Sequence, residues 1–188
     1  TSVARDFVEL PSQLYEHWLE QPEVLDRHAR HAETGAALPA DLRDRIIAAG
    51  NADQGAATLE YLQSALVDLA FHRGAPPADP MARQAEVLAA LDAPTAIPMR
   101  HATPHFAHVF TGDGYSSGYY SYLWSEVMDA DAFEAFVEAG DIFDAETAQR
   151  LEKSILSRGG SLPADQLWTE FRERMPGVAP LLTGRGLI

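Results

Sequence analysis

Apolar residues recur at helical spacing along nearly the whole chain, and prolines and glycines divide this pattern into separate segments. Residues 106–110 are compatible with either a short strand or the end of a helix. The helical spacing along the rest of the chain predicts an all-α, multi-helix fold. The expected helices run from about residues 6–8 to 19 and over 22–33, 39–50, 56–72, 81–91, 119–128, 130–139, 145–157 and 164–174.

The longest predicted helix, residues 56–72, carries a leucine stripe. Its members are three or four residues apart, which places them on one face of a helix. This spacing supports the prediction of one long amphipathic helix for the segment. The stripe consists of Leu59, Leu62, Leu66 and Leu69.

Charge and composition restrict the class of protein. The 188 residues have a formal net charge of −14 and contain no cysteine. Such acidity argues against binding to nucleic acid, because contacts to its phosphates require clustered Lys and Arg. It is also unfavourable for binding to an anionic membrane. No apolar run approaches the ~18 residues that span a bilayer. Because cysteine is absent, any metal must use His, Glu or Asp ligands. We expect a cytoplasmic enzyme.

A segment rich in glycine and tyrosine, residues 112–126, offers candidate chemistry. Glycine permits a left-handed backbone and a close approach to a ligand, and neutral phenols donate hydrogen bonds. These properties suit a mobile loop that closes over a peptide-like substrate. A glycine-rich turn before a core helix, with tyrosines that merely pack, is the alternative.

A second motif, Arg-Asp-Phe-Val-Glu-Leu-Pro-Ser-Gln-Leu-Tyr-Glu-His-Trp, covers residues 5–18, about a hundred residues before the first. Two further motifs follow at residues 155–160 and 185–188. In this order the four segments resemble the thimet oligopeptidase family of zinc metallopeptidases, in particular its bacterial peptidyl-dipeptidase (dipeptidyl carboxypeptidase) branch. The resemblance covers essentially the whole chain and implies the same all-α fold.

The chain departs from this family in one respect, because the zinc-binding motif His-Glu-x-x-His is absent from it. The resemblance implies that this motif precedes Thr1 and that the chain is the C-terminal part of a catalytic region. One zinc ion would then need two histidines from outside this chain, supplied by the remainder of the same polypeptide. By this reading residues 1–20 hold the third zinc ligand, 21–105 form a helical region, and 106–188 form the substrate loop and closing helices.

The resemblance assigns Glu9 as that third zinc ligand. Without the resemblance, Glu9 would be interpreted as an ordinary glutamate at a helix N-terminus, where the macrodipole favours a carboxylate. Glu16 lies two helical turns farther along the same face. It is compatible with steadying a zinc-bound histidine and equally with a surface salt bridge.

Three residues are assigned catalytic roles by the resemblance. Tyr122 is the expected hydrogen-bond donor to the oxyanion of the tetrahedral transition state. Tyr115 is expected to bind the peptide backbone or to assist Tyr122. His108 stands where the family keeps a substrate-contacting histidine.

Other residues of the same segment are expected to line the substrate cleft or to pack. Gly112 and Gly114 would act as loop hinges beside the peptide, and Tyr119 shares a helical face with Tyr122. We expect Tyr120 and Trp124 in the core.

The predicted function is a zinc-dependent peptidase that acts on short peptides and releases C-terminal dipeptides in preference to internal cleavage. Internal cleavage would make it an oligopeptidase of the same family. The competing class is a helical binding or interaction module without chemistry. Dipeptide release needs a group that recognises the substrate's C-terminal carboxylate; Arg100 or another arginine could supply it, and the sequence does not select one.

Overall fold

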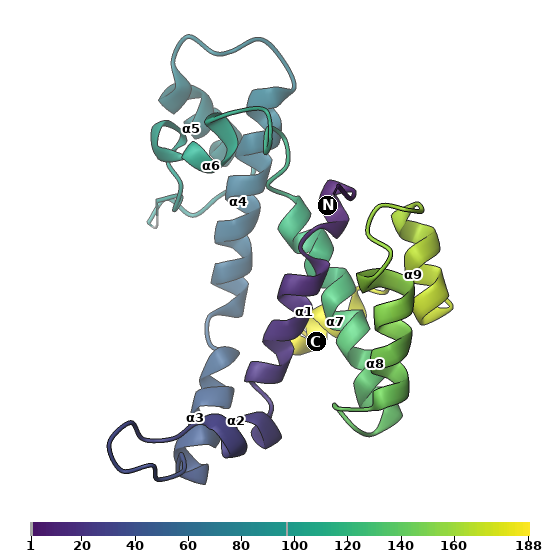
Figure 1. Ribbon diagram of the computed structural model, residues 1–188. Helices are drawn as coiled ribbons and strands as arrows, with labels where there is room; N and C mark the ends of the chain where they lie inside the picture. Colours follow the sequence, from purple (N-terminus) through teal and green to yellow (C-terminus); the bar gives the residue numbers. More distant parts are fainter. Residues whose placement is uncertain (1, 97) are drawn as a thin grey trace. The chain divides into compact units, whose positions relative to one another are not determined.

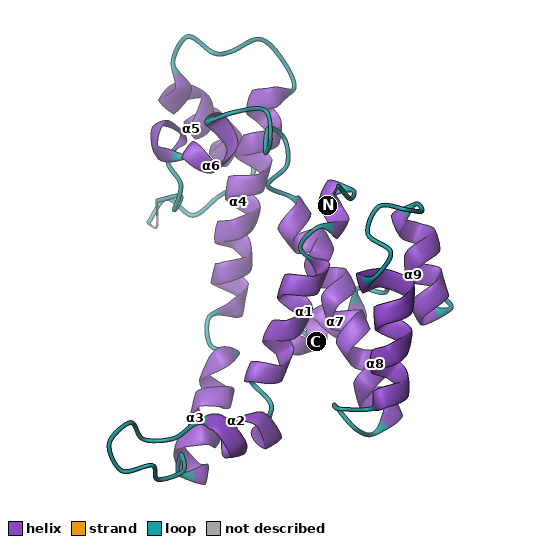
Figure 2. Ribbon diagram, viewed as in Figure 1, coloured by secondary structure: helices purple, strands orange, loops and turns teal. Residues whose placement is uncertain are grey.

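The structure, a computed structural model, describes residues 2–96 and 98–188 (Figure 1). This part of the chain is built from helices and loops and contains no strand (Figure 2). Its one isolated β-bridge joins Arg30 and Ala37. The prediction of an all-α fold is therefore confirmed. None of the described helices has the length and apolarity needed to cross a membrane.

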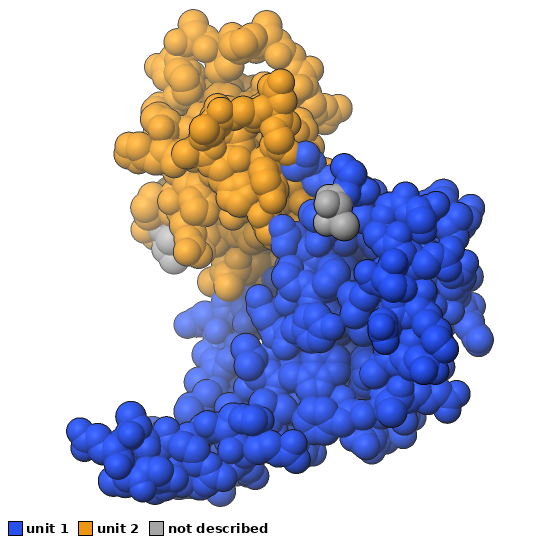
Figure 3. Space-filling model, in the orientation of Figure 1, with its two compact units in different colours: residues 1–54, 123–188 blue, residues 55–122 orange. Residues whose placement is uncertain are grey.

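The chain divides into two compact units, coloured separately in Figure 3. Unit 1 comprises residues 1–54 and 123–188, and unit 2 comprises residues 55–122. The boundaries fall within α4 (Gln54–His72) and near the start of α7 (Ser121–Ala139). These unit boundaries differ from the boundaries of the three functional regions expected from the sequence. The roles assigned to those regions stay predictions.

Unit 1 contains most of the helices, and their bounds correct several expectations. Two predicted helices at 119–139 are one continuous α7. A last helix, α10, was not predicted. Besides α7, the elements are η1 (Arg5–Phe7), α1 (Leu10–Leu19), α2 (Pro22–His28), α3 (Ala40–Gly50), α8 (Ala145–Leu151), the π-helical turn η3 (Glu152–Leu156), α9 (Ala164–Arg172) and α10 (Ala179–Gly184).

Helix α2 ends at His28, five residues before the predicted end. The chain then turns back on itself, and the Leu38 N–H donates to the Ala29 carbonyl at 3.0 Å. Gly35 has φ of +68°, a left-handed conformation that glycine adopts without steric cost. The predicted stop at Gly35 is therefore the tip of a turn and not a helix end.

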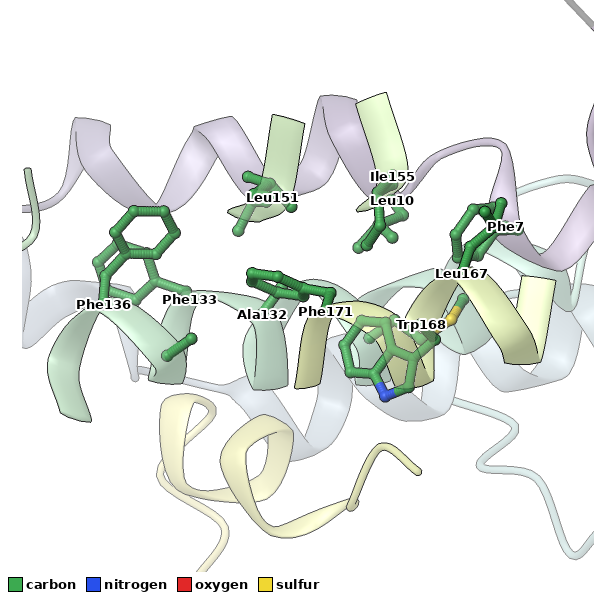
Figure 4. Close-up of a cluster of buried hydrophobic side chains, with 13 residues drawn as sticks. Phe7, Leu10, Ala132, Phe133, Phe136, Leu151, Ile155, Leu167, Trp168 and Phe171 are labelled. Atoms are coloured by element: carbon green, nitrogen blue, oxygen red, sulfur yellow. The ribbon is translucent and has the colours of Figure 1, made fainter. Parts of the chain in front are cut away.

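An apolar core joins α1, α7, α8, η3 and α9 (Figure 4). Leu10 and Leu14, one turn apart on α1, are completely buried. They pack with large residues of the other elements because the i, i+4 spacing aligns them on one face. The remaining members are Phe7, Met128, Ala132, Phe133, Ala135, Phe136, Leu151, Ile155, Leu167, Trp168 and Phe171.

A buried carboxylate joins α7 to the segment that follows α9. Asp131 accepts hydrogen bonds from Arg172 Nε at 2.8 Å, from Arg174 Nη2 at 2.7 Å and from the Gly177 N–H at 2.8 Å. Burial alone would raise the pKa of Asp131, but these hydrogen bonds and the Arg172 charge lower it below its usual value. This network satisfies a charge that would otherwise be costly to bury.

The glycine pair at 159–160 has a steric explanation. Gly159 is left-handed, with φ of +51°. A Cβ added to Gly160 would lie 2.1 Å from the Ser2 carbonyl oxygen, well inside van der Waals contact. The backbone of the N-terminal segment therefore passes Gly160 at a distance that only glycine permits.

Unit 2 is built from α4, α5 (Pro80–Ala90), η2 (Thr103–His105) and α6 (Ala107–Phe110). The ambiguous segment 106–110 is thus resolved mainly as a helical turn. Phe110 contacts α4 through an edge-on contact with Phe71, ring centroids 5.7 Å apart. Helix α5 is tied to η2 because buried Gln84 accepts hydrogen bonds from both the N–H and the hydroxyl of Thr103.

The buried face of α4 does not coincide with its leucine stripe. Leu59 and Leu66 are each 37% exposed, whereas Ser64, Val67 and Asp68 are almost completely buried. The predicted helix is therefore observed, but two leucines of its stripe are more exposed than the neighbouring polar residues. The physical reason is that the buried polar groups have hydrogen-bond partners, Ser64 with the Glu60 carbonyl and Asp68 with the loop before α7, so their burial is compensated.

Candidate active site

The loop from residue 111 to residue 120 carries Tyr115, Tyr119 and Tyr120 and leads into α7, where Tyr122 lies. Two turn-like hydrogen bonds lead it into α7, from Gly118 N–H to Tyr115 O at 2.8 Å and from Ser121 N–H to Gly118 O at 3.1 Å. Residue Ser117 has φ of +56°, an unfavourable left-handed conformation for a residue with a side chain. Such strain persists only where surrounding contacts impose it.

The structure brings His108, Tyr115, Tyr119 and Tyr122 together as one aromatic cluster. The Tyr122 hydroxyl lies 3.0 Å from His108 Nε2. The rings of Tyr115 and Tyr119 stand nearly perpendicular to the imidazole, with centroids 4.5 and 5.5 Å away. Tyr115 and Tyr122 lie almost parallel at 6.4 Å. The cluster therefore unites the three predicted catalytic residues with Tyr119.

The cluster can donate hydrogen bonds to a polar substrate. His108 is exposed and Tyr122 is half-buried, so polar atoms and solvent meet at this surface. The Tyr122 hydroxyl donates to Nε2 when that nitrogen carries no proton, and accepts otherwise. Either arrangement limits how the Tyr122 side chain rotates.

Burial tunes two neighbouring groups. It raises the pKa of Tyr119, where nearby Glu60 adds to the effect and Arg100 opposes it. Burial lowers the pKa of His101, and the positive charge of Arg100 lowers it further. The Tyr119 phenol therefore stays neutral at physiological pH and remains a donor. Arg100 is exposed and close enough to act on both groups electrostatically.

Asp68 is a functional candidate that sequence analysis missed. Its completely buried carboxylate accepts from the N–H groups of Ser117 at 3.1 Å and Tyr119 at 2.9 Å. Its Oδ1 also lies 2.8 Å from His72 Nδ1. The signal was present, since a lone carboxylate within the apolar run of residues 65–71 is unusual unless it has partners.

Among the neighbouring residues, the assignment of the two glycines stays untested and that of Trp124 needs correction. Gly112 and Gly114 are exposed, and neither is among the left-handed glycines of the described chain, so the strained residue of the loop is Ser117. Their assigned contact with substrate stays a prediction. Trp124, expected in the core, is 59% exposed, so that expectation is wrong.

Glu9 lies in unit 1 as the residue immediately before α1. A 3₁₀ turn, η1, precedes it, so the helix begins slightly later than predicted. Ser12 Oγ is 2.9 Å from both the carbonyl oxygen and the carboxylate Oε2 of Glu9. This contact orients a half-buried carboxylate at a helix N-terminus, where the Glu9 side chain makes no capping hydrogen bond.

Glu16 is exposed and lines a cavity of about 470 Å³ within unit 1. Three further carboxylates line it, those of Glu20, Glu126 and Asp129. His17, next to Glu16 in the sequence, had no predicted role. Its Nε2 lies 2.6 Å from Asp129 Oδ1. Burial raises the pKa of Asp129 to about 6, although the hydrogen bond and charge of His17 oppose this.

The described residues do not assemble a complete metal site. They contain no cluster of three or more His, Cys, Asp or Glu side chains placed to share an ion. Glu9 offers one suitable oxygen ligand, whereas a catalytic zinc takes three protein ligands. The sequence-predicted residues therefore fall into two groups, Glu9 and Glu16 in unit 1 and the aromatic cluster with Gly112 and Gly114 in unit 2.

Comparison with known proteins identifies the family. The sequence profile of peptidase family M3 matches residues 1–187. A dipeptidyl carboxypeptidase from Salmonella typhimurium is 40% identical over 195 residues and covers all of this chain. Oligopeptidase A from Escherichia coli is 41% identical over 191 residues, again across the whole chain. A thimet-like oligopeptidase from Dictyostelium discoideum is 35% identical over 191 residues and also covers the whole chain.

The chain spans 28% of the length of each of these relatives. The resemblance expected from the four motifs is confirmed, since the matched proteins include both dipeptidyl carboxypeptidases and oligopeptidases. With a family profile matched over almost every residue and relatives near 40% identity, this chain belongs to peptidase family M3.

Proposed function

We propose that this chain is the C-terminal catalytic part of a zinc-dependent peptidase that hydrolyses short oligopeptides and releases C-terminal dipeptides. The proposal includes the remainder of the same polypeptide as a necessary partner and a cytoplasmic location. The observation that carries it is the cluster of His108, Tyr115 and Tyr122, with the Tyr122 hydroxyl 3.0 Å from the imidazole. The phenol hydroxyls of such a group can donate hydrogen bonds to a peptide carbonyl.

Peptide hydrolysis develops negative charge on the carbonyl oxygen as the carbon becomes tetrahedral. In the proposed mechanism the Tyr122 hydroxyl donates a hydrogen bond to this oxyanion, with His108 holding the phenol in place beforehand. A preorganised donor of this kind stabilises the transition state more than the substrate. Tyr115 and Tyr119 bind the peptide backbone beside it, and neutral phenols do so without placing charge against the amide groups.

Zinc, when bound, would polarise the scissile carbonyl and lower the pKa of an attacking water. Glu9 is the residue of this chain that would hold it, with its carboxylate oriented by Ser12. The other two ligands must come from outside this chain. We therefore expect the isolated 188 residues to bind zinc weakly and to lack peptidase activity, because a lone carboxylate has little selectivity for zinc.

Steady-state kinetics of three phenylalanine variants tests the oxyanion role in the complete enzyme. Tyr122→Phe should lower kcat and kcat/KM together by about 10²- to 10³-fold, with KM little changed. Tyr115→Phe should cost less and act partly on KM. Tyr120→Phe, the matched control, should leave the rate near wild type. Equal losses at Tyr120 and Tyr122 would show that the tyrosines only pack.

Metal analysis of Glu9→Gln tests the ligand role. The amide is nearly isosteric, so helix α1 should persist while zinc content falls. Glu16→Gln, farther along the same helix, is the comparison: if Glu16 steadies a zinc-bound histidine, zinc affinity falls less than in Glu9→Gln, and if it makes only a surface contact, affinity is unchanged. Full zinc content in Glu9→Gln would contradict the proposed site.

Dipeptide release requires recognition of a free C-terminal carboxylate, and Arg100 is our candidate. Its guanidinium acts electrostatically on Tyr119 and His101, so it lies beside the cluster. Arg100→Ala should raise KM for peptides with a free C-terminus and leave C-terminally amidated peptides unaffected. Arg73→Ala, another exposed arginine of unit 2, is the control.

The similarity to oligopeptidase A makes internal cleavage the second candidate, since that relative is as similar as the dipeptidyl carboxypeptidase. The two activities can be distinguished by mass spectrometry of the products from two peptides, one with a blocked C-terminus and one with a free C-terminus. Dipeptides from the free peptide alone support our proposal, and cleavage of both favours the oligopeptidase. A complete protein that cleaves neither would leave the binding-module alternative.

A further inference from the structure

Two side chains of α4 form hydrogen bonds with the backbone of Tyr119, one with its N–H and one with its carbonyl oxygen. The Asp68 carboxylate oxygen Oδ2 accepts from the Tyr119 N–H at 2.9 Å. The Tyr61 hydroxyl donates to the Tyr119 carbonyl oxygen. Tyr61 and Asp68 are seven residues apart on α4, two helical turns, and therefore project from the same face. Both peptide groups of Tyr119 are thus fixed to one helix.

This attachment extends along the loop. The other oxygen of Asp68 accepts from the Ser117 N–H at 3.1 Å and lies 2.8 Å from His72 Nδ1. The Tyr61 ring also stacks on the Tyr119 ring, with centroids 5.4 Å apart and planes 24° apart. Ser117 keeps its left-handed backbone between these contacts. A strained residue held by a fully buried carboxylate indicates a loop whose conformation is imposed from α4.

The held segment lies directly between the residues of the candidate active site. Tyr115 precedes Ser117 by two residues, and Tyr122 follows Tyr119 by three, about one turn into α7. A change in the Tyr119 backbone would therefore displace both phenols relative to His108. Displacements of about 1 Å at a reacting group can cost on the order of 100-fold in rate.

We infer that Asp68 and Tyr61 are positioning residues, which fix the backbone of Tyr119 and thereby place Tyr115 and Tyr122 for the substrate. This inference rests on the proposed function of the cluster and names residues that act through it without touching substrate. Neither residue lies in a motif that suggested the function. We call the pair the Tyr119 clamp.

Hydrogen exchange of the complete enzyme tests the Tyr119 clamp without any activity measurement. Asp68→Asn replaces one acceptor oxygen by an N–H₂ group, which must face either an N–H donor or His72. Exchange at the amides of Ser117 and Tyr119 should become at least about tenfold faster, because their acceptor is weakened. Glu86→Gln, an exposed carboxylate of α5, should leave these amides unchanged. Unchanged exchange in Asp68→Asn would overturn the inference.

Kinetics then tests whether the clamp acts through the tyrosines. Asp68→Asn should lower kcat/KM by about 10- to 100-fold. The same change in a Tyr122→Phe background should cost much less, because the hydroxyl whose position it secures is already gone. Equal costs in both backgrounds would show a general structural role and would contradict the inference.

Tyr61→Phe keeps the test decisive if Asp68→Asn does not fold. It removes one hydroxyl and leaves the stacked ring, so unit 2 should persist, while kcat/KM should fall about 3- to 10-fold through kcat. A wild-type rate in Tyr61→Phe would remove Tyr61 from the clamp. If the wild-type enzyme cleaves no peptide, the proposed function fails, whereas the exchange experiment still decides whether the clamp holds the loop.

Discussion

The two units of this chain are stabilised in different ways. Unit 1 is held by a continuous apolar core that contains Leu10, Phe133 and Trp168. Both units bury polar side chains, but in unit 2 residues such as Ser64, Asp68 and Gln84 are buried outside this apolar core, which lies wholly in unit 1. Apolar packing is non-directional, whereas a buried hydrogen bond specifies one geometry. The difference teaches that the unit with the aromatic cluster gains its precision from directional bonds.

The largest effect should come from the apolar core. Phe171→Ala removes a side chain that is 1% exposed and should lower the free energy of unfolding by about 3–5 kcal/mol. Phe143→Ala makes the same deletion at a side chain that is 51% exposed and should cost about 1 kcal/mol or less. Urea denaturation measures both. Similar losses would mean that unit 1 does not depend on this core.

A buried carboxylate in unit 1 should make stability depend on pH. Burial raises the pKa of Asp129 from 3.8 to about 6, so its protonated form stabilises the fold fully below about pH 4. This contribution, about 3 kcal/mol at most, is lost as pH rises through 6. Thermal melts from pH 4 to 7 should therefore show a decline that Asp129→Asn removes. Asp165→Asn, an exposed control, should retain the decline.

The polar interior of unit 2 offers the contrasting test. Gln84→Leu preserves volume but leaves the buried Thr103 N–H and hydroxyl without their acceptor. The expected loss is about 1–3 kcal/mol, even though the side chain becomes more apolar. Arg83→Ala on the same helix breaks only a surface ion pair and should cost about 0.5 kcal/mol or less. A stabilising Gln84→Leu would refute the contrast between the units.

The smallest effect concerns backbone strain at the end of α9. Glu173 has φ of +59°, a left-handed conformation that a side chain disfavours. Glu173→Gly should stabilise unit 1 by less than about 1 kcal/mol, since relief of strain is partly offset by greater freedom of the unfolded chain. Differential scanning calorimetry would register a small rise in Tm. A fall in Tm would show that the Glu173 side chain contributes a favourable contact.

Helical spacing predicted most elements because it reflects geometry within three or four residues. It located α3, α4, α5 and α9 to within a few residues of their observed bounds. It did not indicate which face of α4 is buried, where Leu59 is exposed and Asp68 is buried. Periodicity counts apolar residues and cannot register that a carboxylate will meet two N–H groups about fifty residues away in sequence.

By itself, the sequence determined the all-α class, the membership of peptidase family M3 and the motifs that single out Glu9, His108, Tyr115 and Tyr122. These follow from local periodicity and from residue order. Only the tertiary structure decided that the Tyr122 hydroxyl meets His108, that Arg172 and Arg174 converge on Asp131, and that Asp68 and Tyr61 fix Tyr119. The physical reason is that hydrogen bonds between distant residues depend on the position of every packed element between them, which local propensity does not specify.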